Sequence, residues 1–515
     1  MPRFETGTPR QELNLNAVIG NNSANALEDV FCFMGETQMG EPDKPTVVQS
    51  EREFLQKFGS LKNGFFQVCI KALRGGVKLC ISRVSHRNTD GSLSATKAAS
   101  VLSINQAPAF FAKNIGDWGN LLKSKIIVGR VTGTVKILVQ LSNIEVESYT
   151  ISEQPSAEDI EIANANLRYI SLNSLLSNQQ LIATSDFDPF SGGTNGVQVT
   201  ASDYIGRQEL QTGVWAFDNL RNIKFVSAPD IALNSVDNAI TQYAQSRSAI
   251  ALLRGPIGST GDACVKYRNC ETPYTGAKID SFWAWCFMGG VSVIDATTSL
   301  ETNISPIADV CISIAKKNKF GKVYESFAIE EYGKISGAVG VDYNVLIASR
   351  RTESDSVFNN GLNAVVVDEN GTIKVWGDNT LAVDFSALSF TGNVEYVQSL
   401  ILRIKPILSK YIHRINKVST WNLMYREIKK VLDEYLTEIG DKRPQGDGKI
   451  GSYIYSGDQN ASKIDAENLK VNTVEGVNSG VYRVILDVQL ISTMRFIRLD
   501  FNASLKGASV TVVPN

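Results

Sequence analysis

The fold is decided by the stretch FSGGTNGVQVTASDYIG (190–206), TGVWAFDNLRNIKFVSAPD (212–230) and RSAIALLRGP (247–256). A glycine-rich turn leads into short helical segments. The apolar runs 223–226 and 248–253 predict buried strands on either side of a helix over 240–247. Because helix and strand continue to alternate, we expect an α/β domain over residues 190–368.

Further landmarks lie on both sides of this stretch. They are short motifs rich in aromatic, glycine and asparagine residues: PTVV (45–48), Phe54, FG (58–59), NIGDWGNL (114–121), NGLN (360–363) and VWG (375–377). In this order the landmarks resemble those of the tail sheath proteins of contractile phages, over roughly residues 45–500. The chain lacks the Pro-Gly-Val-Tyr opening common in that family, so the register of its N-terminal arm stays open.

The resemblance implies a multidomain chain of the α/β and α+β classes. Its central α/β domain would be subtilisin-like, and its C-terminal α+β domain would exchange terminal strands with neighbouring subunits. Short β-rich runs at 125–128 and 135–141 favour a β-sandwich inserted in the chain. The expected parts are an N-terminal arm (1–22), an N-terminal α+β region (23–100), the β-sandwich (101–189), the subtilisin-like domain (190–368) and an inner C-terminal domain with its arm (369–515).

Composition excludes several classes of protein. The 51 basic and 53 acidic residues give a net charge of −2, so no strong field would attract nucleic acid or a membrane surface. Seven cysteines without a CxxC pair favour reduced thiols, and we expect no disulfide between Cys264 and Cys270. The first thirty residues lack a signal-peptide pattern and no run of 18 apolar residues occurs, so we expect a soluble chain.

The residues that catalysis would need are missing from the central domain. A Ser-His-Asp site requires a histidine, but the two histidines, His86 and His413, lie outside 190–368. Both are predicted to be solvated side chains, since no cluster of metal ligands surrounds either. The turn GGTNG (192–196) lacks the Gly-Lys-Ser/Thr ending of a phosphate-binding loop. The sequence therefore predicts no enzyme, no metal and no cofactor.

Both ends of the chain contain alternating apolar and polar residues, which is typical of half-buried strands. An ordinary sheet within one subunit would explain this pattern. The resemblance instead implies arms that add as strands to a neighbouring subunit. The apolar arm residues are Leu13, Leu15, Ala17, Ile19, Ile497, Leu499, Phe501, Val510 and Val512.

A basic stripe is predicted on an amphipathic helix of the C-terminal domain, interrupted or started at Pro406. At 100° per residue, one edge of this helix would carry Arg403, Lys410, Arg414 and Lys417. A solvated helix face would explain the stripe equally well. The resemblance makes these four residues candidates for contact with a tail tube.

The resemblance implies a structural subunit of a contractile tail sheath. It would assemble as stacked hexamers around a tail tube and contract to drive the tube through a cell envelope. Its partners would be further copies of itself, the tube protein, the baseplate and the tail terminator. It would be found in a virion tail assembled in the host cytoplasm. Alternatives are the sheath of a phage-derived injection system or bacteriocin particle, and a non-contractile capsid or baseplate protein.

Overall fold

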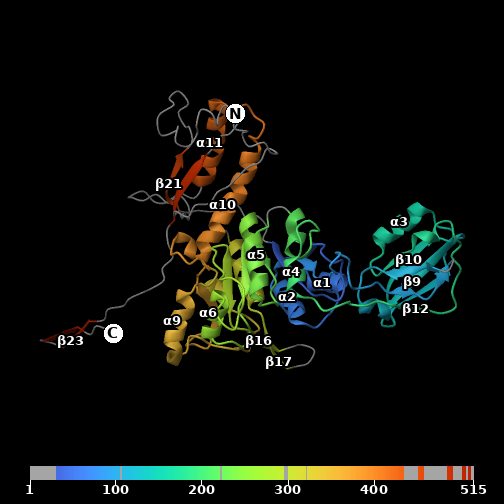
Figure 1. Ribbon diagram of the computed structural model, residues 1–515, viewed down its shortest axis with the longest axis horizontal. Helices are drawn as coiled ribbons and strands as arrows, with labels where there is room; N and C mark the ends of the chain where they lie inside the picture. The colour runs from blue at the N-terminus through green and yellow to red at the C-terminus, as the bar shows by residue number, and fades with distance from the viewer. Residues whose placement is uncertain are drawn as a thin grey trace. The chain divides into compact units, whose positions relative to one another are not determined.

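The computed structural model describes residues 30–104, 107–220, 223–294, 300–320, 322–433, 450–456, 484–490, 502–505 and 508–511. The chain forms two compact units, whose elements are labelled in Figure 1. The larger unit comprises Asn25–Gly321 and Phe327–Asp384. The smaller unit comprises Met1–Ala24, Lys322–Ser326 and Phe385–Asn515.

The larger unit contains an eight-stranded sheet with the order β2-β3-β1-β13-β14-β15-β19-β20. Neighbouring strands are parallel from β3 to β19, and the edge strands β2 and β20 run antiparallel. Central strands such as VFCFMG in β1 and AWCFM in β15 are apolar throughout, as expected where both faces of a sheet are covered. The strands are Val30–Gly35 (β1), Thr46–Val48 (β2), Lys78–Arg83 (β3), Phe225–Ser227 (β13), Ile250–Arg254 (β14), Ala284–Met288 (β15), Leu362–Val367 (β19) and Ile373–Trp376 (β20).

The predicted α/β stretch lies in the middle of this sheet. The predicted strands 223–226 and 248–253 correspond to β13 and β14, with helix α5 (Asn234–Arg247) between them. Strands β1 and β3 come from the region predicted separately as 23–100, yet they belong to the same sheet.

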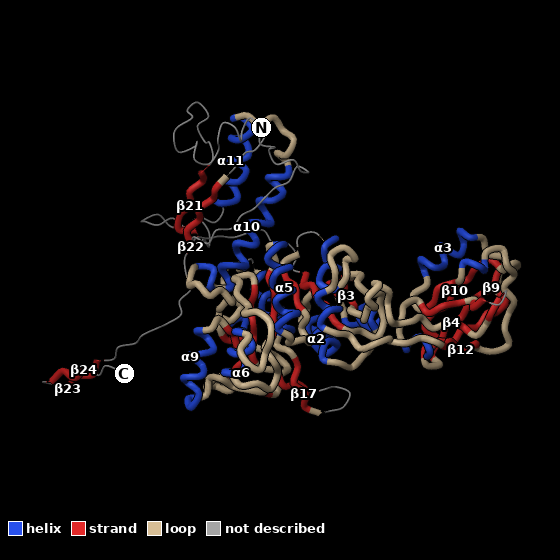
Figure 2. Tube along the Cα trace, viewed as in Figure 1, coloured by secondary structure: helices blue, strands red, loops and turns tan. Residues whose placement is uncertain are grey.

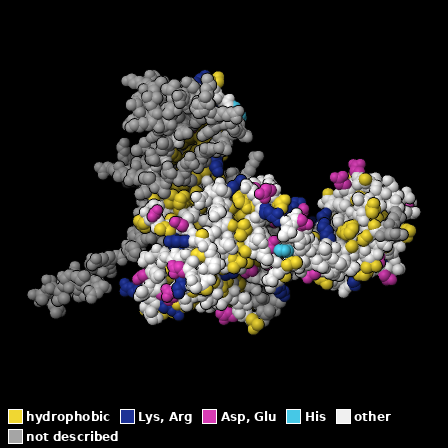
Figure 3. Space-filling view, in the orientation of Figure 1, with side chains coloured by type: hydrophobic (Ala, Val, Ile, Leu, Met, Phe, Trp, Pro, Cys, Tyr) yellow, Lys and Arg dark blue, Asp and Glu magenta, His cyan; other side chains and the backbone are white. Residues whose placement is uncertain are grey.

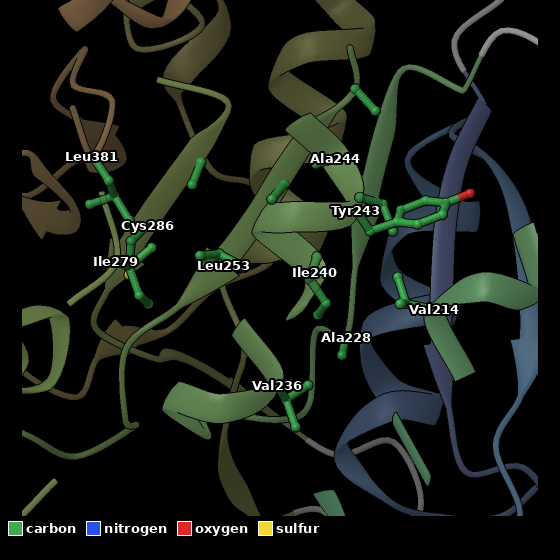
Figure 4. Close-up of a cluster of buried hydrophobic side chains, with 14 of the residues drawn as sticks. Val214, Ala228, Val236, Ile240, Tyr243, Ala244, Leu253, Ile279, Cys286 and Leu381 are labelled. Atoms are coloured by element: carbon green, nitrogen blue, oxygen red, sulfur yellow. The ribbon is translucent and has the colours of Figure 1, made fainter. Parts of the chain in front are cut away.

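Helix α5 covers one face of the sheet with apolar side chains. Val236, Ile240 and Tyr243 are fully buried and lie in one cluster with Leu253 and Cys286 of the strands (Figure 4). Burying an aliphatic side chain of this kind contributes about 1.5–3 kcal/mol. Other helices of the unit are α1 (Glu51–Phe58), α2 (Gly64–Arg74), α4 (Ala201–Ile205), α6 (Gly261–Asn269), α7 (Ile307–Lys319), α8 (Glu330–Gly333) and α9 (Arg351–Asn359).

Residues 99–191 of the larger unit, here called the lobe, hold a second sheet and its own core. Seven strands follow the order β10-β9-β8-β12-β4-β7-β11. Helix α3 (Ala157–Asn166), labelled on the lobe in Figure 2, packs against both edge strands. Its Ile160 and Ala163 belong to the lobe core. The strands are Ala99–Ser100 (β4), Phe110–Ala112 (β7), Leu122–Val128 (β8), Thr134–Leu141 (β9), Ile144–Ser152 (β10), Ile170–Leu172 (β11) and Asp188–Ser191 (β12). The sequence predicts a β-sandwich here but not helix α3.

The smaller unit contains a helical hairpin and two short sheets. Helices α10 (Thr391–Ser409) and α11 (Val418–Asp433) pack against each other. Strands β21 (Ile450–Ser456) and β22 (Ile485–Leu490) form one antiparallel pair, and β23 (Asn502–Leu505) and β24 (Ala508–Thr511) form another.

Candidate functional site

Enzymes with α/β folds bind their ligands at the carboxyl ends of parallel strands. In this chain, the carboxyl ends of β3 and β14 carry arginines that donate to backbone oxygens. Arg83 is buried and donates to the carbonyls of Gly40 and Ile115 over 3.0 and 2.9 Å. Burial lowers the pKa of Arg83 to about 10. Arg254 donates to the carbonyls of Pro229, Asp230 and Gly255.

Asp230 fills the adjacent position at the end of β13. Its carboxylate accepts a hydrogen bond from the backbone of Phe65, at the start of α2. A Cβ at Gly64 would lie 2.0 Å from Asp230 Oδ1, so only glycine fits there. Burial raises the pKa of Asp230. These charged side chains hold the strand ends and helix α2 together, which is a structural role.

His86 is hydrogen-bonded to Asp203 rather than lying free in solvent, so the prediction for this histidine is wrong. Its Nδ1 lies 2.9 Å from Asp203 Oδ2, and the imidazole is only 21% exposed. Asp203 also accepts from Thr200 and from the backbone of Arg87. Burial raises the pKa of Asp203, but these hydrogen bonds outweigh it and hold the pKa below its usual value.

The His86–Asp203 pair does not form a catalytic triad. Within the described residues, no hydroxyl forms a hydrogen bond with the second nitrogen of His86. The cavity beside it is about 70 Å³ and is lined by polar groups that include Asp43, Arg87 and Thr212. A site for a substrate of ordinary size needs several hundred cubic ångströms. His413 is exposed.

The described residues do not provide what a metal site, a disulfide or a membrane-spanning helix would require. They contain no group of three or more His, Cys, Asp or Glu side chains that could hold a metal ion. All seven cysteines are free, including Cys264 and Cys270. Among the helices that the structure describes, none is long and apolar enough to cross a membrane.

The predicted basic stripe is broken by the end of α10, so its placement on a continuous helix is wrong. Helix α10 continues through Pro406 and stops at Ser409, with Lys410 as its cap. The backbone of His413 then turns to a φ of 68°, which an α-helix does not allow. Arg403 lies on α10, whereas Arg414 and Lys417 lie on the loop between α10 and α11.

This loop is held to α11 by Glu427. Lys410 Nζ and the Tyr411 hydroxyl donate to the Glu427 carboxylate over 2.7 and 2.9 Å. The hydrogen bond from Lys410 is the main reason that the pKa of Glu427 is lowered. The Arg414 guanidinium lies 5.0 Å from the centre of the Tyr411 ring, and Arg414 and Lys417 are both exposed. Lys410 is therefore partly neutralised, and Arg414 and Lys417 present the basic surface.

Most of the predicted arm residues lie outside the described residues. These are Leu13, Leu15, Ala17, Ile19, Ile497, Leu499, Phe501 and Val512. Val510 is in β24, opposite Ala503 of β23 in the same chain. The β21–β22 pair has no third strand among the described residues, so each of its strands has one edge to which a further strand could be added.

A scan of protein-family models found no match, and a search of curated proteins found none either. Solved structures do match. The sheath tail protein of Listeria innocua has a TM-score of 0.56 at 15% identity, covering 80% of this chain and 85% of that one. The helical sheath of the anti-feeding prophage in its contracted state has a TM-score of 0.54 at 10% identity, covering 96% and 99%. The sheath complex of PVC, an extracellular contractile injection system, has a TM-score of 0.52 at 13% identity, covering 98% and 99%.

The chain has the fold of contractile tail sheath proteins. In this sheath fold, three of the four predicted tube-contact residues, Lys410, Arg414 and Lys417, come from one short segment at the turn of the helical hairpin, and Arg403 lies on α10 itself. Sequence reasoning missed the pairing of Lys410 with Glu427. Lys410 caps α10 and Glu427 lies on α11, 17 positions later, so no local spacing predicts the contact.

Proposed function

We propose that this protein is a structural subunit of a contractile sheath. The observation that carries the proposal is the agreement with two contracted sheath structures over 96–98% of this chain. The strand ends support it, because Arg83 and Arg254 there bind backbone carbonyls of the same chain, and the polar cavity beside His86 and Asp203 is about 70 Å³. Catalysis has no part in this function.

In this proposal, subunits polymerise as stacked hexamers around a tail tube. The sheath is assembled in an extended, metastable form, and its fall to a compact form drives the tube through an envelope. No phosphate-binding loop ending in Gly-Lys-Ser/Thr follows the turn at 192–196, so the energy is stored in subunit contacts rather than drawn from a nucleotide.

The terminal segments link subunits by strand exchange. The alternating segments around Leu13–Ile19 and Ile497–Phe501 have the period of strands, and the β21–β22 pair has edges available for further strands. Each backbone hydrogen bond gained in this way contributes about 1 kcal/mol. Subunits joined through such strands could rotate past one another without separating.

The α10–α11 loop contacts the tube. Arg414 and Lys417 are exposed and basic, and an acidic tube surface would complement them. Lys410 supports this surface by fixing the loop to Glu427, and Arg403 adds a charge on α10. Individual exposed pairs contribute only about 0.2–1 kcal/mol, but a sheath repeats them in every subunit.

The particle is proposed to be a phage tail or a phage-derived injection system, including a bacteriocin particle. The baseplate and tail terminator would bind the ends of the sheath, and assembly would occur in the host cytoplasm. The central domain is proposed to share the layout of subtilisin-like folds. Unlike a subtilisin-type enzyme, this domain has no histidine within residues 190–368 that could act in a catalytic triad. A non-contractile capsid or baseplate role is the second candidate.

Electron microscopy of the purified full-length chain tests the proposed function. We expect hollow tubes of variable length, alone or on added tail tubes. Discrete monomers at all concentrations, or closed shells, would contradict a sheath and favour the second candidate.

A further inference from the structure

The strands and helix of the lobe form a closed ring. Helix α3 packs against β10 at one edge of the seven-stranded sheet and against β11 at the other edge. From α3, the ring passes through β10 and β9 to β8 in one direction, and through β11, β7, β4 and β12 in the other. Strand β12 therefore lies opposite α3 in this ring, with β8 beside it.

The outer face of β8 and β9 carries three lysines. Buried residues alternate with half-buried ones along both strands, which places Lys123, Lys125 and Lys136 on the side away from the core. The register pairs Lys125 with Leu138 and Ile127 with Lys136. This surface, here called the lysine face, thus has lysines around two aliphatic side chains, Ile127 and Leu138.

The lysine charges are not compensated by ion pairs within the described residues. Lys123 Nζ donates to the Asn143 side chain over 2.8 Å, and Lys125 Nζ donates to the Ser185 carbonyl over 2.6 Å. Both acceptors are neutral. Two exposed carboxylates border the face: Glu145 of β10, which lies opposite Gln140 of β9, and Asp186, next to Ser185.

The outer face of α3 has the opposite charge. Glu158 and Glu161 are exposed, and Ile162 beside them is 49% exposed. Asp159 accepts from the Ser156 backbone and hydroxyl in a capping box, which fixes the start of the helix. Figure 3 shows acidic side chains gathered on the part of the lobe where α3 lies in Figure 1. This acid-and-aliphatic surface matches the lysine face in composition.

We infer that the lysine face of one copy binds the outer face of α3 on a second copy of this chain. A helix with its side chains is about 10–12 Å across, and the two strands β8 and β9 side by side are about 10 Å wide, so the outer face of α3 matches the width of the lysine face. Ile162 would meet Ile127 and Leu138, while Glu158 and Glu161 would meet the lysines. The repetition of this contact from subunit to subunit depends on the proposed sheath function.

Such a contact joins two different surfaces of the same subunit. A contact of this kind does not close on itself in a dimer, so it continues from copy to copy as a ring or a helix. The lobes would therefore add a second, salt-sensitive connection between subunits, independent of the terminal arms and of the tube.

Site-directed disulfide formation tests the contact directly. Full-length Lys125→Cys protein is mixed with full-length Glu161→Cys protein and oxidised, both in tubes and in soluble protein over a concentration series. We expect a covalent heterodimer to form several-fold faster than in a control mixture of Lys278→Cys and Glu161→Cys proteins. Lys278 is exposed elsewhere in the larger unit, so it serves as the matched control.

Charge reversal tests the complementarity. Adding Lys123→Glu and Lys136→Glu to the Lys125→Cys protein should abolish the excess of heterodimer. When this lysine-reversed protein is mixed with Glu161→Cys protein that also carries Glu158→Lys, much of the excess of heterodimer should return. The matched control adds Lys62→Glu and Lys334→Glu, which change two exposed lysines outside the lobe and should have no effect.

The outcomes separate this contact from the proposed function. If the parent forms tubes but no heterodimer exceeds the control, the lobe contact is wrong and the sheath function stands. If no tubes form, the sheath function fails, and cross-linking of the soluble protein still decides the contact. If reversal of the lysines impairs assembly and Glu158→Lys restores nothing, the lysine face serves a different partner and the inference is overturned.

Discussion

Lys410 Nζ donates to Glu427 over 2.7 Å and ties the α10–α11 loop to helix α11. Because this lysine is already paired within the subunit, its charge is the least available of the three in the loop segment. Arg414 and Lys417 should therefore carry most of any attraction between this loop and a tube.

The double substitution Arg414→Glu and Lys417→Glu should weaken assembly on tail tubes while Lys410 keeps the loop in place. The loss should be largest at low salt, where charges are screened least. Co-sedimentation with purified tubes across a salt series measures it. The control Lys62→Glu and Lys278→Glu changes net charge equally and should behave like the parent. Unchanged co-sedimentation of the loop variant would mean that the tube contact lies elsewhere.

The N-terminal arm should be needed for polymerisation but not for folding. Leu13→Asp with Leu15→Asp disrupts the apolar side of the alternating segment, so a donated strand could no longer pack on a neighbour. We expect a soluble, folded protein by circular dichroism that forms no tubes. The control Asn14→Asp with Asn16→Asp adds the same charge on the polar side and should polymerise. Cooperative unfolding of the first variant would place the strand in an intramolecular sheet.

Substitutions of the two histidines should differ in their effect on the stability of the fold, and neither should change any hydrolytic activity. His86→Ala leaves the nearly buried Asp203 carboxylate without one partner and should cost about 1–3 kcal/mol in the free energy of unfolding. His413→Gly should be neutral or slightly stabilising, because glycine adopts a φ of 68° without strain. Denaturant unfolding measures both. Peptide or ester hydrolysis that depends on either histidine would contradict the structural role.

Asp237 should make the protein less stable as the pH rises. This carboxyl on α5 is buried, and burial raises its pKa from 3.8 to about 7, although the Tyr267 hydroxyl donates to it over 2.5 Å. Since the pKa of Asp237 is higher in the folded chain, the contribution of this carboxyl to stability is fully present below pH 3.8 and is lost as the pH rises through about 7.

Asp237→Asn keeps an acceptor for Tyr267 and removes the ionisation. The variant should gain about 1–4 kcal/mol over the parent at pH 8 and little at pH 4. Denaturant unfolding at both pH values measures the difference. The exposed Asp355→Asn on α9 is the control and should show no such pH dependence. An equal effect of Asp237→Asn at the two pH values would rule out a buried, titrating carboxyl.

Local patterns predicted the local elements well. The apolar runs at 223–226 and 248–253 are the strands β13 and β14, because buried strands are continuous apolar segments bounded by turns. That β1 joins β13 in one sheet could not be predicted, since Phe31 meets Phe225 across almost two hundred positions of sequence. Pairing at such a distance leaves no periodic signal.

Errors arose where one backbone angle or one distant partner decides the structure. The apolar period of α10 continues through Tyr411 and Ile415 in the sequence, but the φ of His413 ends any helix before Lys417. His86 was predicted to be solvated because its neighbours in sequence are polar, whereas its partner Asp203 follows 117 positions later. Helix α3 was missed within a β-rich region, although Ser156 and Asp159 form a capping box at its start.

Helical reconstruction of the assembled protein by cryo-electron microscopy tests the sheath function most directly. The sheath proposal predicts a hollow tube with six subunits in each ring and with Arg414 and Lys417 of the α10–α11 loop lining the channel. A closed shell, a filament without a channel, or a tube with this loop on its outer surface would contradict it.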